Sequence, residues 1–313
     1  MQSSGDRSVQ KVFVVINPKA GKEDQAAEVR ATLARHFAFP DWEIEIHETV
    51  EKEDIAAICR ETCVRGASLV VAAGGDGTIV GVANGLVRGS VPLGILPLGT
   101  GNFLARALLV PMKLEEAADL LVGDHATTPV DALEVDGRHY FTNVSVGMSP
   151  QAVVETSSAD KKRLGRLAYV LAMIRQSAIF RLRRFKVELD GQSRWVRASE
   201  VLISNTTLLE KPPVLFGPPE TLGDGQLEVY TVTARTPGDY LGLLWGLLFR
   251  PRRPAASLTH GTARRSVRVR SFRRPSLVQA DGEVIGRTPV EILLVAKAIH
   301  VITPATVRVL DQS

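Results

Sequence analysis

Short apolar runs alternate with longer segments of mixed polarity from Lys11 to about Val122. Runs rich in β-branched residues predict strands at 11–16, 42–47, 67–73 and 91–97. Apolar residues three or four positions apart predict amphipathic helices at 21–37, 51–65 and 77–88. Strands and helices that alternate in this way form βαβ units, so the sequence predicts an α/β domain with a parallel sheet and helices on both faces.

After Pro129 the pattern changes to strand-like segments joined by turn signals. Residues 129–147 and 185–204 each predict a hairpin, with Asp136-Gly137 and Asp190-Gly191 at the turns. Helical stretches near 164–180 and 240–249 interrupt this pattern. We therefore expect the α/β domain over residues 1–127 and a second, antiparallel β-rich domain over 128–299, while the last segment, about 300–313, could return to either domain.

Three glycine-containing turns each follow a predicted strand and precede a helix. They are "NPKAG" (17–21), "GGDGT" (74–78) and "LPLGTGN" (96–102). Unpaired backbone amides and the positive end of a helix dipole favour a phosphate at such turns. "NPKAG" alone could be a capped helix start. Because the carboxyl ends of neighbouring parallel strands meet at one edge, the three turns together predict a nucleotide phosphate site, although none is a Walker P-loop or a GxGxxG fingerprint.

Asp76 places a carboxylate among these glycines. A carboxylate beside phosphate is repulsive unless it binds Mg²⁺ or orients a hydroxyl group. The alternative is that Asp76 caps a helix that begins near Thr78. Read alone, the residue leaves both interpretations open.

In order and spacing, the three turns resemble the catalytic-domain family of diacylglycerol kinases, which includes sphingosine and ceramide kinases and the bacterial lipid kinases. The resemblance continues in "GDGQLEV" (223–229) and "QADGEVIG" (279–286), so it covers nearly the whole chain. It implies a nucleotide-binding domain beside a β-sandwich, with the active site in the cleft between them. It implies ATP contacts at Asn17, Pro18, Lys19, Ala20, Gly21, Thr49, Gly74, Gly75, Asp76, Gly77, Thr78, Thr100, Gly101 and Asn102.

The resemblance also implies roles for individual residues. Asp76 falls on the aspartate associated with phosphate and Mg²⁺ chemistry, and Glu283 on the glutamate proposed as the general base. Asp224, with backbone carbonyls near Thr221 and Gln226, falls on a structural Mg²⁺ site. From the residues alone, Glu283 could equally be a solvated hairpin carboxylate, because Asp281-Gly282 is a turn signal.

The chain departs from the family pattern beside two of the motifs. Val80 and Gly81 stand where family members commonly have Asn-Glu, and Phe103 stands where an aspartate is common. These changes remove polar side chains but leave the glycine turns intact. We interpret them as variation within the family.

Charge and composition bear on the partner. The net charge is +4, and no acidic residue lies between Asp239 and Asp281, where nine arginines occur. Residues 161–185 and 240–253 mix basic and apolar side chains in a way that suits peripheral contact with an anionic membrane surface, although these faces could equally pack on the second domain. A nucleic-acid partner is not favoured, because no recognisable module occurs and aromatic residues make up only 5% of the chain.

The sequence thus predicts an ATP- and Mg²⁺-dependent lipid kinase that phosphorylates the hydroxyl of a lipid such as diacylglycerol. The alternatives are an NAD kinase-like phosphotransferase and a nucleotide-binding regulator that has lost catalysis. Polar residues 1–10 and the short apolar run 241–249 favour a cytoplasmic protein with no signal peptide and no spanning helix. The two cysteines, Cys59 and Cys63, are expected to be reduced and structural, and a homodimer remains open.

Overall fold

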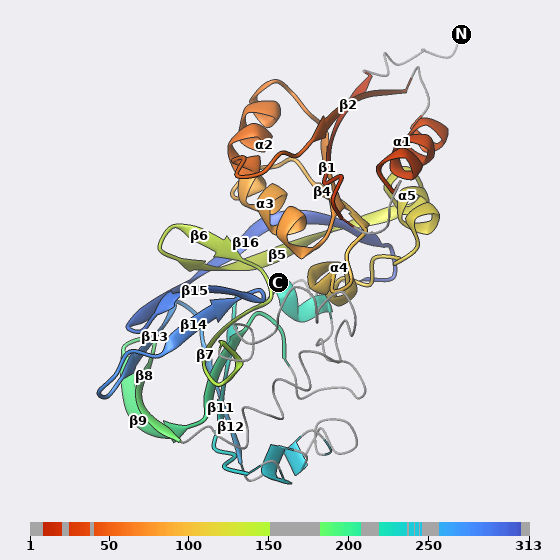
Figure 1. The fold of residues 1–313 in the computed structure, drawn as a ribbon. Coiled ribbons are helices and arrows are strands. Elements are labelled where there is room, and N and C mark those ends of the chain that lie inside the picture. Colours follow the sequence, from red (N-terminus) through yellow and green to blue (C-terminus); the bar gives the residue numbers. More distant parts are fainter. Residues whose placement is uncertain are drawn as a thin grey trace. The chain divides into compact units, whose positions relative to one another are not determined.

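The computed structural model describes residues 9–20, 25–37, 41–150, 182–207, 219–236, 238–240, 242–243, 245 and 257–307. The chain forms two compact units, which are described separately: residues 1–130 with 297–311, and residues 131–296 (Figure 1). The predicted helix at 164–180 lies outside the described residues. Of the predicted helix at 240–249, the described positions 240, 242, 243 and 245 are helical.

A sheet with parallel strands organises the first unit, as the sequence predicts. The strand order is β2 (Trp42–Glu48), β1 (Gln10–Ile16), β3 (Leu69–Gly74) and β4 (Leu93–Pro97), followed by the end of β16 (Val290–Pro304), which pairs with β4 at Val301. Every one of these pairs is parallel. Strands β3 and β4 are buried along their whole length, which explains why their sequences are apolar without alternation.

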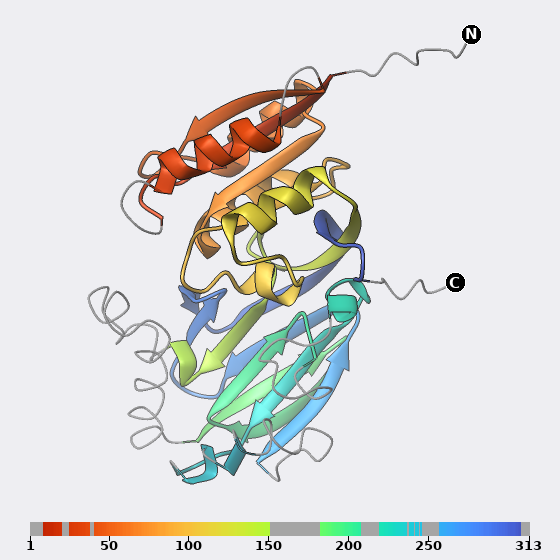
Figure 2. The ribbon, with the colours of Figure 1, turned by 90° about the vertical axis from the view of Figure 1, so that its right-hand side faces the viewer.

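Helices cover both faces of this sheet. α1 (Gln25–His36) packs on α5 (Leu114–Val122) over one face, and α2 (Ile55–Val64) packs on α3 (Asp76–Leu86) over the other; α4 (Phe103–Ala107) follows the third glycine turn (Figures 1 and 2). The sequence pattern did not identify α5. Cys59 of α2 is a buried free thiol, and burial raises its pKa to about 12, so it is a packing residue rather than a nucleophile.

The second unit is built from antiparallel strands. One sheet has the order β12 (Leu258–Ala263), β11 (Leu227–Val232), β10 (Glu200–Ser204), β7 (Asn143–Gly147), β14 (Leu277–Ala280) and β15 (Glu283–Arg287). The other contains the first part of β16, β13 (Ser266–Ser271), β8 (Arg183–Leu189) and β9 (Gln192–Ala198), with β5 (His125–Val135) paired to β16 and β6 (Arg138–Tyr140). A short 3₁₀ helix, η1, spans Pro219–Gly223. One apolar cluster contains residues of both sheets, among them Val144, Phe185 and Ile203, so this unit is the expected sandwich.

Aspartate-glycine pairs form the hairpin turns where the sequence predicts them. Asp136-Gly137 joins β5 to β6, and Asp190-Gly191 joins β8 to β9, with positive φ at all four residues. Two consecutive positive φ angles define the type I′ turn. The Asp190 carboxylate also accepts hydrogen bonds from the backbone amides of residues 264, 265 and 266, so this turn holds the start of β13.

A buried carboxyl group, Glu200, lies inside the second unit. It accepts hydrogen bonds from the backbone amides of Met148, at 2.6 Å, and Ser149, at 3.0 Å, and its other oxygen hydrogen-bonds the Ser149 hydroxyl. The Ser149 hydroxyl in turn lies 2.7 Å from Ser145 Oγ. Burial raises the pKa of Glu200, and the hydrogen bonds only partly oppose this effect. The folded state therefore favours the protonated acid.

Glu200→Gln is expected to remove a pH dependence of stability. Because the folded-state pKa is raised, Glu200 contributes full stability below its unfolded pKa and loses it as the pH rises through the folded pKa, by about 1.4 kcal/mol for each unit between the two values. Glutamine keeps a side-chain oxygen that can accept the backbone amides of Met148 and Ser149, and its side chain does not titrate. Urea unfolding at about pH 5 and about pH 8 should show a smaller loss of stability for the variant than for the wild type. Parallel pH profiles would contradict this role.

Candidate active site

The three glycine turns lie together at the carboxyl edge of the first unit's sheet. They follow β1, β3 and β4, which are neighbours. Backbone hydrogen bonds join them: the Asn17 amide donates to the Ala73 carbonyl at 3.0 Å, and the Leu98 amide donates to the Gly74 carbonyl at 2.9 Å. The Thr49 amide donates to the Ile16 carbonyl at 2.9 Å, which brings the residue after β2 to the same edge. The structure therefore groups the described residues of all three turns and Thr49.

The first turn is tied to the second by side chains. Asn17 Nδ2 donates to the hydroxyl of the buried Thr78 at 3.3 Å, and the Asn17 side-chain oxygen accepts the Lys19 amide at 3.0 Å. Pro18 and Lys19 are exposed, and the Lys19 ammonium pairs with Glu51 at 2.7 Å, which lowers the pKa of that carboxyl. Gly21 lies outside the described residues.

Asp76 joins the second turn to the third. Its two carboxylate oxygens accept the Asn102 amide at 2.8 Å and the Phe103 amide at 2.5 Å. These amides begin α4, whose N-cap residue, Asn102, makes no capping bond of its own. The interpretation of Asp76 as a cap of its own helix is wrong, because α3 begins at Asp76 itself with Gly75 as the N-cap. Asp76 instead caps α4 across the sheet edge.

Close backbone approach explains two of the glycines. A Cβ atom at Gly99 would lie 2.7 Å from the Gly75 Cα atom, and one at Gly101 would collide with a carboxylate oxygen of Asp76. Gly77 differs from both. It lies in the first turn of α3, has no positive φ, and an added Cβ would meet no atom of another described element within 4 Å. The described part of the fold therefore does not require glycine at position 77.

The third turn also contains residues with internal roles. The wholly buried Asn102 adopts a left-handed conformation, and its side chain closes the turn through bonds to the Gly99 backbone. Thr100 is exposed. Arg106, which the sequence analysis missed, donates from Nε to the Gly101 carbonyl at 2.8 Å. Its position four residues after the N-cap was the available signal, because helical side chains point toward the N-terminus.

The structure bears on two of the three departures from the family pattern, Gly81 and Phe103. A Cβ atom at Gly81 would lie 3.3 Å from the Ile55 side chain of α2, so a larger residue there would require the Ile55 side chain to shift. Phe103 contributes its backbone amide to Asp76 whatever its side chain. Nothing in the structure explains Val80 beyond its helical position.

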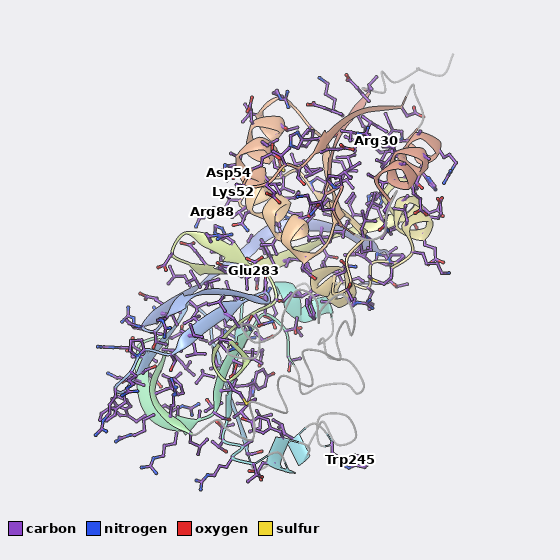
Figure 3. The ribbon with its side chains drawn as sticks, viewed as in Figure 1. Arg30, Lys52, Asp54, Arg88, Trp245 and Glu283 are labelled. Carbon is purple, nitrogen blue, oxygen red and sulfur yellow. The ribbon has the colours of Figure 1, made fainter. Side chains whose placement is uncertain are left out.

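In the second unit, the two carboxylates of the "DGE" segment (281–283) have different environments. Asp281 accepts the backbone amides of Phe141, Thr142 and Asn143 at 2.9 to 3.1 Å and the Thr142 hydroxyl at 2.6 Å. Glu283 is exposed at the start of β15, next to this turn (Figure 3). The hairpin that presents Glu283 is thus fixed by Asp281, a role that the sequence analysis did not assign.

Asp224 lies in the loop between η1 and β11. Its carboxylate accepts the Gln226 amide at 2.9 Å, while the fully buried Asp131 accepts the Gly225 amide at 2.7 Å. Burial, with smaller contributions from Asp131 and Glu228, raises the pKa of Asp224 to about 6. Thr221 lies within η1 and is partly buried, as is Gln226. A cation would relieve the unfavourable burial of this negative charge.

The sequence analysis did not identify Asp131 as a site residue, although an aspartate within the apolar run "PVDALEV" was a usable signal.

Among the described residues, no three His, Cys, Asp or Glu side chains gather as a metal site, so Mg²⁺ at Asp224 would need backbone carbonyls and water as further ligands. In the same part of the chain, no helix is long and apolar enough to cross a membrane.

Comparison with known proteins agrees with this geometry. Residues 11–135 match the family model described as "Diacylglycerol kinase catalytic domain", and residues 142–310 match "YegS C-terminal NAD kinase beta sandwich-like domain". A protein named "Diacylglycerol kinase" from Bacillus subtilis is 27% identical over 296 residues, which covers 93% of this chain and 95% of that protein. A Pseudomonas aeruginosa protein named "Probable lipid kinase YegS-like" is 38% identical over 163 residues, or 51% of this chain and 52% of that protein.

A solved structure of a diacylglycerol kinase from Bacillus anthracis has a TM-score of 0.74 at 26% identity and covers 96% of this chain and 99% of that one. Along the chain, the catalytic-domain match comes first, as the parallel sheet does, and the sandwich-domain match comes second, as the antiparallel sheets do. The glycine turns occur within the first match, and Asp224 and Glu283 occur within the second. The chain therefore belongs to the diacylglycerol kinase catalytic-domain family of lipid kinases.

Proposed function

We propose that this lipid kinase transfers the γ-phosphate of ATP to a hydroxyl group of diacylglycerol or a chemically similar lipid, with Mg²⁺ as the metal. The observation that carries the proposal is the convergence of three glycine turns at one sheet edge, with open space above Gly77. Because the described part of the fold does not require glycine at position 77, we infer that the space is kept for a phosphate group. The relatives named as diacylglycerol kinases support the choice of acceptor.

We infer that the nucleotide phosphates bind to the turns at 17–20, 74–78 and 99–102. The start of α3 offers backbone amides and the positive end of a helix dipole, which favour phosphate oxygens. Asp76 holds the third turn against the second through its bonds to the start of α4. Asn17 and Thr78 hold the first turn in the same arrangement. These contacts keep the cradle in place before the ligand enters, which lowers the barrier through preorganisation.

Glu283 is the proposed general base. Phosphoryl transfer requires a group within hydrogen-bond reach of the acceptor hydroxyl, and a carboxylate can accept its proton as the new P–O bond forms. Glu283 is exposed, and no hydrogen bond from another described residue engages its side chain. Asp281 fixes the turn beside it, so the carboxylate is presented from an ordered hairpin.

Mg²⁺ is proposed at Asp224, because burial raises the pKa of this carboxyl group to about 6 and so makes its negative charge unfavourable in the absence of a cation. Asp224, together with backbone carbonyls near Thr221 and Gln226, would hold the ion. Mg²⁺ held there would supply positive charge beside the Asp224 carboxylate and would restrain the loop between η1 and β11. Mg²⁺ typically keeps several waters and needs only one or two carboxylates.

Asp224→Asn is expected to abolish stabilisation by Mg²⁺. Mg²⁺ at about one hundred times its dissociation constant should add about 2.7 kcal/mol to the free energy of unfolding of the wild type. The variant should show no such gain and, without Mg²⁺, should be at least as stable near neutral pH, because it removes a buried charge. Thermal unfolding with and without Mg²⁺ measures both effects. The exposed-turn variant Asp136→Asn should keep the Mg²⁺ response, and an equal response in Asp224→Asn would contradict the assignment.

The acceptor is tested by incubating the purified protein with labelled ATP, Mg²⁺ and a panel of diacylglycerol, sphingosine, ceramide, phosphatidylglycerol and NAD. We expect the label in diacylglycerol or another lipid. Label in NAD alone would contradict the proposal, and label in no acceptor would favour a regulator that binds nucleotide without catalysis.

A further inference from the structure

The outward surface of three strands in the second unit is cationic and aromatic. β9, β8 and β13 are neighbours (Figure 1), and their alternate side chains face opposite ways. The inward residues, such as Phe185 and Val187, belong to the buried sandwich core. The opposite surface, which we name the arginine face, consists of Arg184, Lys186, Trp195, Arg197, Arg270 and Phe272.

The strand register places like charges opposite one another on the arginine face. Arg184 is opposite Arg197, and Lys186 is opposite Arg270. Like charges directly across a pair of strands are destabilising. In the described part of the chain, none of these four side chains forms an ion pair. An anionic partner would relieve this repulsion.

The acidic residues of β8 and of the neighbouring strand β16 do not neutralise the arginine face. Glu188 and Glu291 both pair with Arg268, at 3.5 Å and 2.8 Å, and Glu291 raises the pKa of that guanidinium. Charge is therefore balanced around Arg268 and left unbalanced around Arg184 and Arg270. Figure 3 shows nitrogen-tipped side chains projecting outward around these strands.

Two large aromatic side chains are exposed on the arginine face, next to Arg184. Trp195 is 50% exposed and Phe272 is 49% exposed, with ring centroids 5.6 Å apart and planes at 85°. The Arg184 guanidinium lies over both rings, 5.4 Å from Trp195 and 4.8 Å from Phe272. Arginine and tryptophan are typical of the membrane interface, where an apolar body and a polar tip are both accommodated.

A separate pocket of about 450 Å³ includes Arg183, which alternation along β8 places on the side of Phe185 and not on the arginine face. Its lining consists of Arg183, Arg274, Arg287, Pro275 and Leu277. Arg183 Nη1 donates to the Ser276 hydroxyl at 3.1 Å, which orients its guanidinium. Guanidinium groups bind phosphate oxygens through paired hydrogen bonds, so the chemistry of this pocket fits a phosphate-bearing headgroup.

We propose that the arginine face docks the protein on a bilayer of anionic phospholipid. Single-stranded nucleic acid is the other polyanion, but it needs free aromatic faces for base stacking, and Arg184 already lies over both rings. The surface lies within the second unit, and of its residues only Arg184 belongs to the stretches at 161–185 and 240–253. The proposal concerns binding to the bilayer surface, and it stands whether or not the phosphotransfer assignment is correct.

The test uses the full chain and vesicles that contain no acceptor lipid. Sedimentation with vesicles of phosphatidylglycerol and phosphatidylcholine in equal parts measures binding, and pure phosphatidylcholine is the uncharged reference. Arg184→Gln with Arg270→Gln should weaken binding to the anionic vesicles about thirtyfold, since each basic residue near such a surface contributes a factor of about five. The charge-matched control, Arg60→Gln with Arg88→Gln, removes two exposed arginines of the first unit and should bind as the wild type does.

Two further measurements keep the outcome unambiguous. Thermal unfolding of Arg184→Gln with Arg270→Gln should show only a small change in stability, because relief of the two like-charge pairs offsets the lost contacts of Arg184 with the two rings. Phosphorylation of a dispersed short-chain acceptor should also be unchanged, so failure of docking and failure of catalysis are distinguishable. Unaltered binding to anionic vesicles, an equal loss in the control pair, or tighter binding of a single-stranded oligonucleotide than of vesicles would each overturn the proposal.

Discussion

Glu283→Gln is expected to lower kcat for lipid phosphorylation by about a hundredfold to ten-thousandfold, the range of a general base. The glutamine has the same size but cannot accept the proton of the acceptor hydroxyl. Because Glu283 is exposed and the adjacent Asp281 holds the turn, the hairpin should remain folded. ATP binding should be retained, since the glycine turns that form the proposed phosphate site do not include Glu283. Steady-state kinetics with ATP titration measures both quantities.

A matched control separates catalysis from the loss of a surface charge. Asp136→Asn removes another exposed carboxylate at a type I′ hairpin turn of the second unit, and asparagine tolerates the left-handed conformation. This variant should keep the wild-type kcat. If Glu283→Gln also turned over at the wild-type rate, Glu283 would be the solvated hairpin carboxylate that its sequence context alone allows.

Gly77→Ala is expected to weaken ATP binding by at least about tenfold, which corresponds to about 1.4 kcal/mol, while leaving the protein as stable or more stable. The added methyl group meets no atom of another described element within 4 Å, and alanine is the better helix former by about 0.5–1 kcal/mol. The expected clash is therefore with the proposed phosphate group. Calorimetric titration of ATP and thermal unfolding together show whether binding and stability change in opposite directions.

Gly238→Ala is the appropriate comparison for this experiment. A Cβ atom there would lie 3.7 Å from Thr236 Oγ1, which is an ordinary van der Waals contact, and Gly238 lies in the second unit. Both variants should fold, and only Gly77→Ala should lose affinity. Unchanged ATP affinity in Gly77→Ala would mean that the open space above α3 is not part of the nucleotide site.

Local patterns were sufficient to predict strands β1 to β4 and the two Asp-Gly hairpins, whereas strands β12 to β16 were not predicted individually. β3 and β4 are buried along their length, so their apolar runs are continuous, and the Asp-Gly turns of the second unit follow from backbone conformation alone. Helix boundaries were less accurate. α2 begins at Ile55 rather than at Glu51, because Asp54 caps it by accepting the Ala57 amide at 3.0 Å.

Individual hydrogen bonds between residues far apart in the chain could not be predicted from local sequence patterns. The bonds from Asp76 to the start of α4 span 26 and 27 residues, so neither helix-cap rules nor motif spacing revealed that Asp76 joins two turns. Asp281 likewise holds Thr142 across 139 residues. In both places the sequence identified the right motif, but only the folded chain showed which side chain has a structural role.

The most direct test of the central claim is amide hydrogen exchange with and without ATP and Mg²⁺. If the three glycine turns bind the nucleotide phosphates, peptides that contain residues 17–20, 74–78 and 99–102 should exchange more slowly when the nucleotide is present. Peptides from the arginine face should be unaffected under the same conditions. Unchanged exchange at all three turns, with protection elsewhere, would contradict the account.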